Sequence, residues 1–149
     1  MSNPVVSYLQ GLIGKSDVKS PSAAGNWLGG QLVAAEEGDI TLQYLVRPDM
    51  TNPAGTLHGG VATLMMDDVM GVTLFSLHKS HIFVTINIHV DFLSTVRAGE
   101  TVSVHCWVVR DGRRVVNLEA TIHDLKGKIL ARATSNMGIT DWPNPFNPK

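Results

Sequence analysis

Cysteine is almost absent from this sequence, and the signals of secretion are missing with it. Cys106 is the single cysteine, so no disulfide can form within one chain. We expect a protein of the reducing cytoplasm in which Cys106 is a small core residue. The first residues lack the basic start and the cleavage site of a signal peptide, and no apolar run is long enough to span a bilayer. These absences argue against a secreted or membrane-inserted protein.

An excess of charge of either sign is also missing. The chain carries 12 basic and 13 acidic side chains, for a formal net charge of -1. Without a positive field there is no general attraction to nucleic acid or to an anionic lipid surface. We therefore expect neither nucleic acid nor a membrane as a partner.

Motifs of several enzyme classes are absent too. The Gly59-Gly60 pair is not followed by the Lys-Ser/Thr of a P-loop and forms no dinucleotide fingerprint. There is no Gly-x-Ser-x-Gly elbow of an α/β-hydrolase. The histidines are scattered, and His58 and Asp67 have no further His or Cys at ligand spacing, so we expect no metal and no cofactor.

Length and hydrophobic content predict one domain. The 149 residues, 44% of them hydrophobic, are enough for a single substantial core. We assign residues 1–149 to this domain, with its core at roughly 27–140. A short amphipathic helix is expected at 5–13, and the three prolines after Asp141 predict an irregular tail that docks through Trp142 or Phe146.

Apolar periodicity predicts strands around one long helix. Strands are expected at 27–33, 40–46, 84–92, 102–108, 116–122 and 129–135. In the strand 84–92, the even-numbered apolar residues share one face and Thr85 lies on the other. The segment 61–77 is apolar nearly all round, which predicts a buried helix. The expected fold is α+β, with two strands, the helix, and then a four-strand antiparallel meander that wraps it.

The segment 52–60, Asn-Pro-Ala-Gly-Thr-Leu-His-Gly-Gly, is the most informative part of the chain. A glycine pair at the start of a helix leaves backbone N–H groups free and lets a ligand approach them closely. Asp67 follows inside the apolar helix, about 12 Å from Gly59 at ordinary helical rise. The two groups of one chain therefore cannot hold the same atom. A two-fold pair with antiparallel helices would bring them together, so a homodimer is expected.

These features resemble the hotdog-fold acyl-CoA thioesterases of the PaaI type. The resemblance rests on element order, on Asn52, and on the nine residues from His58 to Asp67 within roughly residues 27–140. The segment 85–93, Thr-Ile-Asn-Ile-His-Val-Asp-Phe-Leu, and Gly99-Glu100 are similar to the strand and turn that follow the helix in that family. The implied fold is a hotdog, an antiparallel sheet wrapped around a central helix.

The resemblance also implies an activity and roles for individual residues. The activity is hydrolysis of an acyl-CoA to free acid and CoA by a homodimer or a dimer of dimers (homotetramer). Asp67 would activate water or attack the thioester carbonyl, and the Gly59 N–H would polarise that carbonyl. Asn52 would help to position the nucleophile, and His58 would orient the loop and the thioester. Thr85 stands where some relatives have a serine that assists the water.

Further assignments concern residues near the proposed substrate. Gly60 is expected to border the substrate. Arg113 and Arg114, after the predicted hairpin turn, either contact the phosphates of CoA or are simply solvated. Neighbouring helix positions point about 100° apart, and the family spacing selects Asp67 over Asp68.

Two rival functions are compatible with the same fold. One is a non-catalytic protein that binds acyl-CoA through the same fold. The other is a hotdog dehydratase, which is disfavoured because those enzymes pair a catalytic histidine with an acid in a different motif. Neither the acyl group, nor the choice between CoA and a carrier protein, nor the choice between general base and anhydride chemistry follows from the sequence.

Overall fold

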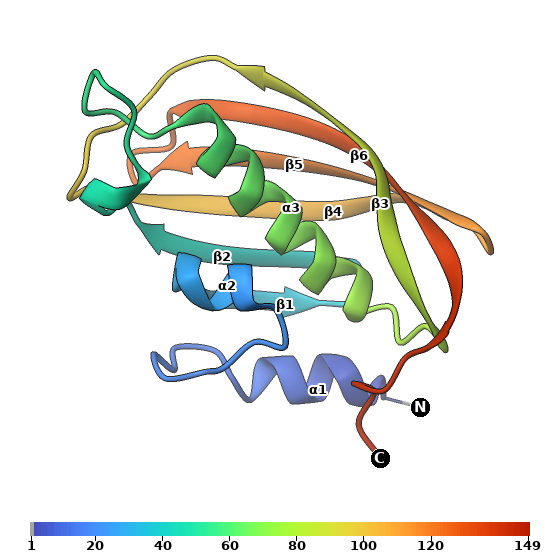
Figure 1. The fold of residues 1–149 in the computed structure, drawn as a ribbon. Coiled ribbons are helices and arrows are strands. Elements are labelled where there is room, and N and C mark those ends of the chain that lie inside the picture. Colours follow the sequence, from blue (N-terminus) through green and yellow to red (C-terminus); the bar gives the residue numbers. More distant parts are fainter. Residues whose placement is uncertain (1) are drawn as a thin grey trace.

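The computed structural model describes residues 2–149, in which a curved antiparallel sheet wraps around one long helix (Figure 1). The helices are α1 (Pro4–Gln10), α2 (Ala23–Leu28) and α3 (Gly59–Phe75), with a short 3-10 turn η1 (Pro48–Met50). The strands are β1 (Gln31–Glu36), β2 (Asp39–Leu45), β3 (His81–Phe92), β4 (Thr101–Asp111), β5 (Val115–Asp124) and β6 (Ile129–Pro143). This arrangement confirms the predicted α+β hotdog fold.

Strand order corrects one part of the prediction. The sheet runs β1-β2-β4-β5-β6-β3, and every pairing is antiparallel. β4, β5 and β6 do form a meander, but β3 pairs with β6 at the far edge and not with β4. The predicted four-strand meander is wrong because periodicity identifies strands but carries no information on which strands pair.

The N-terminal segment contains a helix where a strand was expected. Trp27 and the residue after it belong to α2, so the strand predicted at 27–33 begins only at Gln31. The Ser22 hydroxyl accepts a hydrogen bond from the Gly25 N–H and caps the start of α2. Gly29, with a φ of 68°, ends the helix in the left-handed conformation that glycine adopts most readily.

The C-terminal tail is shorter than predicted, and of its two predicted docking residues only Phe146, 52% exposed, borders a cavity of the fold. β6 continues to Pro143, so only 144–149 are irregular. The side-chain amides of Asn144 and Asn147 donate to the Lys79 carbonyl, at 3.2 and 3.0 Å. Trp142 remains 61% exposed. Amide hydrogen bonds to the segment after α3 therefore hold the tail, and docking through Trp142 is not observed.

The core lies between the sheet and the inner face of α3. Buried residues of α3 are Ala62, Met65, Met66, Val69, Met70, Thr73 and Leu74. They face alternate residues of the central strands, and each fully buried aliphatic side chain of this kind contributes roughly 1.5–3 kcal/mol. Cys106 is one of these buried strand residues, and burial raises the pKa of its thiol to about 12. Its predicted role as a core residue is confirmed.

A β-bulge interrupts β3. Thr85 is opposite Met137 and Asn87 is opposite Asn136, so Ile86 is one residue more than the partner strand provides. The side-chain oxygen of Asn87 accepts a hydrogen bond from the Asn136 N–H at 3.1 Å. This bond ties the bulged strand to its neighbour.

The bulge changes which side chains face α3. Before it, Phe83 is buried and Thr85 contacts the helix, whereas Ile86 is 58% exposed. After it, Ile88 and Val90 pack on the core. The predicted uniform alternation through 84–92 is therefore wrong in the first half of the strand, because one extra residue shifts the faces by one position.

Candidate active site

The start of α3 presents a free backbone donor. His58 has extended backbone angles (φ −63°, ψ 134°), and its Nδ1 accepts a hydrogen bond from the Gly60 N–H at 2.9 Å. The Gly59 N–H has no acceptor among residues 2–149. A free N–H at the positive end of a helix suits an oxygen that gains negative charge.

Phe92, at the end of β3, lies against this glycine. A Cβ placed on Gly59 would be 3.3 Å from two ring carbons of Phe92. Phe92 is itself 58% exposed. The missing side chain of Gly59 thus allows an aromatic ring to lie close to the start of the helix. Sequence analysis did not single out Phe92, because in a strand of alternating apolar residues it reads as one more core position.

Asn52 organises the loop that leads to the glycine pair. Its side-chain oxygen accepts from the N–H groups of Ala54 and Thr56, both at 3.1 Å, and its amide donates to the Thr56 hydroxyl at 2.9 Å. These bonds form a compact turn within residues 52–56. Asn52 is therefore placed to shape the loop, and its side-chain hydrogen bonds are all to residues of that loop.

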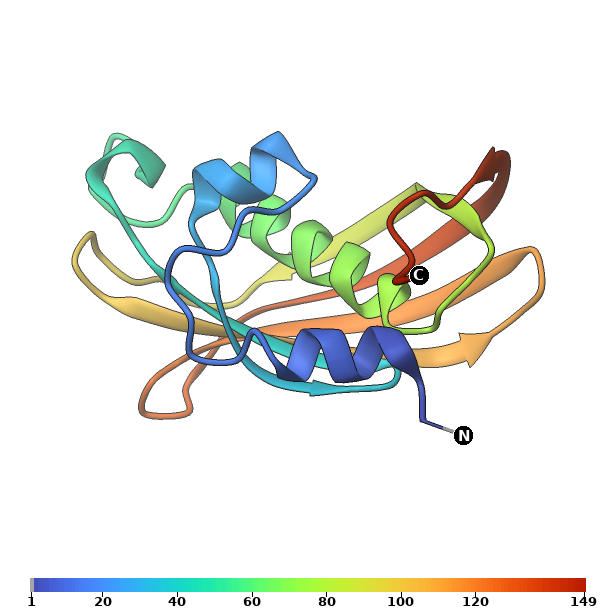
Figure 2. The same ribbon diagram turned by 90° about the horizontal axis from the view of Figure 1, so that it is seen from below.

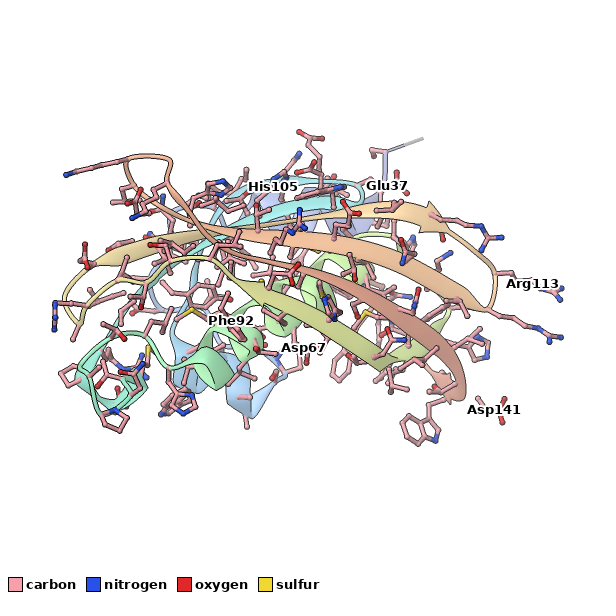
Figure 3. The ribbon with its side chains drawn as sticks, turned by 90° about the horizontal axis from the view of Figure 1, so that it is seen from above. Glu37, Asp67, Phe92, His105, Arg113 and Asp141 are labelled. Carbon is pink, nitrogen blue, oxygen red and sulfur yellow. The ribbon has the colours of Figure 1, made fainter. Side chains whose placement is uncertain are left out.

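Asp67 and Thr85 meet between α3 and β3. Asp67 is half-buried in the middle of the helix, and its Oδ1 accepts a hydrogen bond from the Thr85 hydroxyl at 2.9 Å. Figure 3 shows Asp67 in the space between these two elements. The predicted alternation placed Thr85 on the face opposite the apolar residues, and the bulge at Ile86 is the reason that it faces the helix instead.

Asp68 faces the other side of α3 and is bound to Tyr44. The Tyr44 hydroxyl donates to Oδ2 of Asp68 at 2.8 Å, and Tyr44 is only 1% exposed. Burial raises the pKa of Asp68; the Tyr44 hydrogen bond opposes this shift and the nearby charge of Asp67 adds to it. Burial, followed by the Asp68 charge, likewise raises the pKa of Tyr44. The two adjacent acids therefore have different partners, and the one left beside the exposed strand edge is Asp67.

Tyr44 was not recognised from the sequence as a partner of an acid. In the alternating strand 40–46 it fits a core position, and only the packing of β2 under α3 shows what its hydroxyl binds. The Tyr44 ring also explains why residue 30 is a glycine. A Cβ on Gly30 would lie 2.5 Å from that ring.

The two arginines are not near Asp67 of their own chain. In Figure 3, Arg113 extends from the tip of the β4–β5 hairpin, away from Asp67 and Phe92. Both Arg113 and Arg114 are exposed. One chain therefore brings together Asp67 with Thr85, and His58 with the glycine pair, but leaves the arginines apart from both groups.

A cavity of about 980 Å³ adjoins both acids. It is bordered by α1, the segment 15–22, α2, the outer face of α3 and the tail residues Phe146 and Pro148. Figure 2 shows α2 beside α3, with α1 and the C-terminal segment near the end of that helix. Within residues 2–149 no three His, Cys, Asp or Glu side chains gather as a metal site. No helix in the described part of the chain is long and apolar enough to cross a membrane.

Comparison with known proteins agrees with this geometry. Human acyl-coenzyme A thioesterase 13 is 24% identical over 110 residues, which cover 72% of this chain and 79% of that protein. The Escherichia coli PaaI protein superposes with a TM-score of 0.77 at 20% identity, over 83% of this chain and 88% of that one. A Streptococcus mutans protein whose structure was solved bound to acetyl CoA superposes with a TM-score of 0.73 at 21% identity, over 88% of this chain and 99% of that one.

The resemblance to the PaaI type that the motif spacing indicated is thus confirmed for the fold and the family. The model of the Thioesterase superfamily matches residues 54–131, more than half of the 149 residues. That range begins just before the glycine pair, includes all of α3 and β3, and extends into β6. The chain therefore belongs to the thioesterase superfamily and is homologous to acyl-coenzyme A thioesterase 13.

Proposed function

We propose that this protein hydrolyses acyl-CoA thioesters to a free acid and CoA. The observation that carries the proposal is the Asp67–Thr85 hydrogen bond on an otherwise apolar helix, next to a cavity of about 980 Å³. Membership of the thioesterase superfamily supports the reaction class. The acetyl CoA complex of the Streptococcus mutans relative supports CoA as the carrier.

In the proposed reaction, Asp67 acts as general base. The Thr85 hydroxyl binds Oδ1 and leaves Oδ2 to take a proton from water. The water oxygen attacks the thioester carbonyl carbon, the carbonyl oxygen becomes an oxyanion, and its collapse breaks the C–S bond to release CoA thiolate and the acid. The alternative to this general-base route is direct attack of the free Oδ2 on the carbonyl carbon, which would form an anhydride.

The Gly59 N–H is proposed to stabilise the oxyanion. His58 occupies the Gly60 N–H, so the histidine fixes the turn and leaves the Gly59 donor available. A donor held at a helix N-terminus need not reorganise when charge develops on the carbonyl oxygen. In this proposal Gly60 borders the thioester and Asn52 holds the loop in shape.

We further propose that two chains complete each site. β3 lies at the edge of the sheet, with Asp67 and Thr85 toward its start and Gly59 against Phe92 at its end. If β3 pairs antiparallel with β3 of a second copy around an axis near residues 88–89, Thr85 of one copy and Phe92 of the other come to the same end of the paired strands. Asp67 of one chain is then brought toward Gly59 of the second, which supports a homodimer or a dimer of dimers.

The proposed roles of Arg113 and Arg114 also depend on this assembly. Their hairpin extends away from the Asp67 of the same chain. Binding of CoA phosphates by these arginines would therefore occur at a site formed with another copy, where their guanidinium groups could pair with phosphate oxygens.

Asn substitutions at the two adjacent acids test the activity. Asp67→Asn keeps the size of the side chain but removes the base, so kcat should fall by at least about a hundredfold. Asp68→Asn keeps an oxygen acceptor for Tyr44 and should retain kcat within about threefold. Thiol release is measured with purified protein and a panel of acyl-CoA and acyl-carrier substrates.

The same measurements separate the rival outcomes. Comparable loss of activity in both variants would refute the role of Asp67. If the wild type binds acyl-CoA in calorimetry but releases no thiol from any substrate, the protein is a non-catalytic acyl-CoA binder.

A further inference from the structure

Gly71 lies in the middle of α3 without a structural need for glycine. A Cβ placed on it would meet no atom within 4 Å, and its φ is not positive. Gly25 differs, because a Cβ there would lie 2.7 Å from a carboxylate oxygen of Asp68. Glycine weakens a helix interior relative to alanine. Neither close packing nor a left-handed backbone accounts for glycine at position 71.

The absence of a side chain at Gly71 leaves space in the cavity beside α3. It follows Asp67 by one helical turn, so both residues lie on the same face of α3. That face borders the cavity of about 980 Å³, which continues past Gly71 to Phe75. The path from Asp67 to Phe75 is about 12 Å along the helix.

The walls of this path are suited to hydrocarbon. Leu9 of α1 and Leu12, just after that helix, line it on one side, and Phe146 of the tail also borders it. Val72 and Phe75 line it from α3 itself. An apolar chain buried here is removed from water without leaving a polar group of its own unpaired.

We propose that the acyl chain of the substrate runs from Asp67 across the bare backbone of Gly71 toward Phe75, so that Gly71 sets the acyl length the protein accepts. The inference rests on the proposed thioesterase function and names its substrate class, an unbranched aliphatic acyl group of medium length. A side chain at position 71 projects into this path and shortens it. A short acyl group ends before Gly71 and is unaffected.

The test compares Gly71→Ala and Gly71→Leu on acetyl-CoA and decanoyl-CoA. For Gly71→Leu, kcat/KM for decanoyl-CoA falls by about tenfold or more, mainly through KM, while acetyl-CoA turnover is unchanged. Gly71→Ala gives a smaller loss for decanoyl-CoA and raises Tm by about 2–4 °C, because alanine favours the helix. Ala34→Leu is the matched control, since Ala34 is exposed on β1 outside the cavity and its substitution leaves both substrates unaffected.

Several results would overturn the proposal. Equal loss for the two substrates in Gly71→Leu, or an unchanged preference in both variants, would show that the acyl chain lies elsewhere. A changed oligomeric state with unchanged preference would show that this helix face contacts another copy. If the wild type releases no thiol, the proposed function fails, and calorimetry of decanoyl-CoA still decides the inference: weaker binding to Gly71→Leu supports it, and equal binding refutes it.

Discussion

Proline at position 59 removes the proposed oxyanion donor while preserving the helix. Gly59 is the first residue of α3, a position where proline is well tolerated because its N–H has no partner within the helix. His58 precedes it with φ −63° and ψ 134°, within the region that a residue before proline adopts. Gly59→Pro should therefore fold normally, with a free energy of unfolding unchanged or raised by up to about 1 kcal/mol.

The expected loss of activity follows from the single donor removed. Loss of one oxyanion-hole donor lowers kcat by about 10²–10³, equivalent to roughly 2.7–4 kcal/mol of transition-state stabilisation. KM should change little, because the hydrogen bond strengthens only when charge develops on the carbonyl oxygen. The measurement is kcat and KM for an acyl-CoA that the wild type hydrolyses, together with Tm for each variant.

Gly59→Ala is the matched control for this experiment. It retains the N–H but places a Cβ 3.3 Å from the Phe92 ring, as proline also does. Phe92 is 58% exposed and can shift by the few tenths of an ångström required, so we expect less than about a fivefold loss in the alanine variant. If the alanine and proline variants have kcat values within about threefold of one another, the Gly59 N–H is not an oxyanion donor.

Two further predictions concern the adjacent acid and the assembly. Because burial raises the pKa of Asp68 above 3.8, the folded protein binds this proton more tightly than the unfolded chain. The free energy of unfolding of the wild type should therefore fall relative to that of Asp68→Asn as pH rises from 3.8 to the raised pKa, and fall no further above it. Urea unfolding of both proteins across this pH range measures the difference between the two free energies. A difference that stayed constant would contradict the prediction. For the shared site, equal amounts of inactive Asp67→Asn and Gly59→Pro chains should regain about a quarter of wild-type activity after subunit exchange, because half of the dimers are mixed and each mixed dimer holds one intact site. A mixture that stays inactive although exchange is demonstrated would place the whole site in one chain.

Residue patterns were sufficient to predict most elements of the fold but not their pairing. The apolar run after Gly60 and the alternating strands are local properties, so α3 and the β4–β6 meander could be identified from short stretches. The pairing of β3 with β6 depends on contacts between distant parts of the chain, which local periodicity does not encode. Trp27 was wrongly predicted to lie in a strand because Ser22 was not recognised as the N-cap of a helix.

The candidate site shows the same division. The spacing from His58 to Asp67 could be read directly, and its resemblance to the family pattern selected Asp67 over Asp68. The Thr85 side chain faces α3 only because Ile86 is one extra residue in β3. Asp68 is bound by a hydrogen bond from Tyr44, which belongs to a strand distant in the sequence. Such contacts arise only when the sheet closes on the helix.

The bulge in β3 also determines how this strand can meet other molecules. An edge strand exposes unpaired N–H and C=O groups, and a regular edge can pair with almost any extended chain. Ile86 breaks the spacing of these groups in β3, so an incoming strand can form an uninterrupted ladder only with the part that follows the bulge, residues 87–92. The irregularity that turns Thr85 toward Asp67 therefore also limits aggregation, because it restricts uninterrupted edge pairing to a short segment.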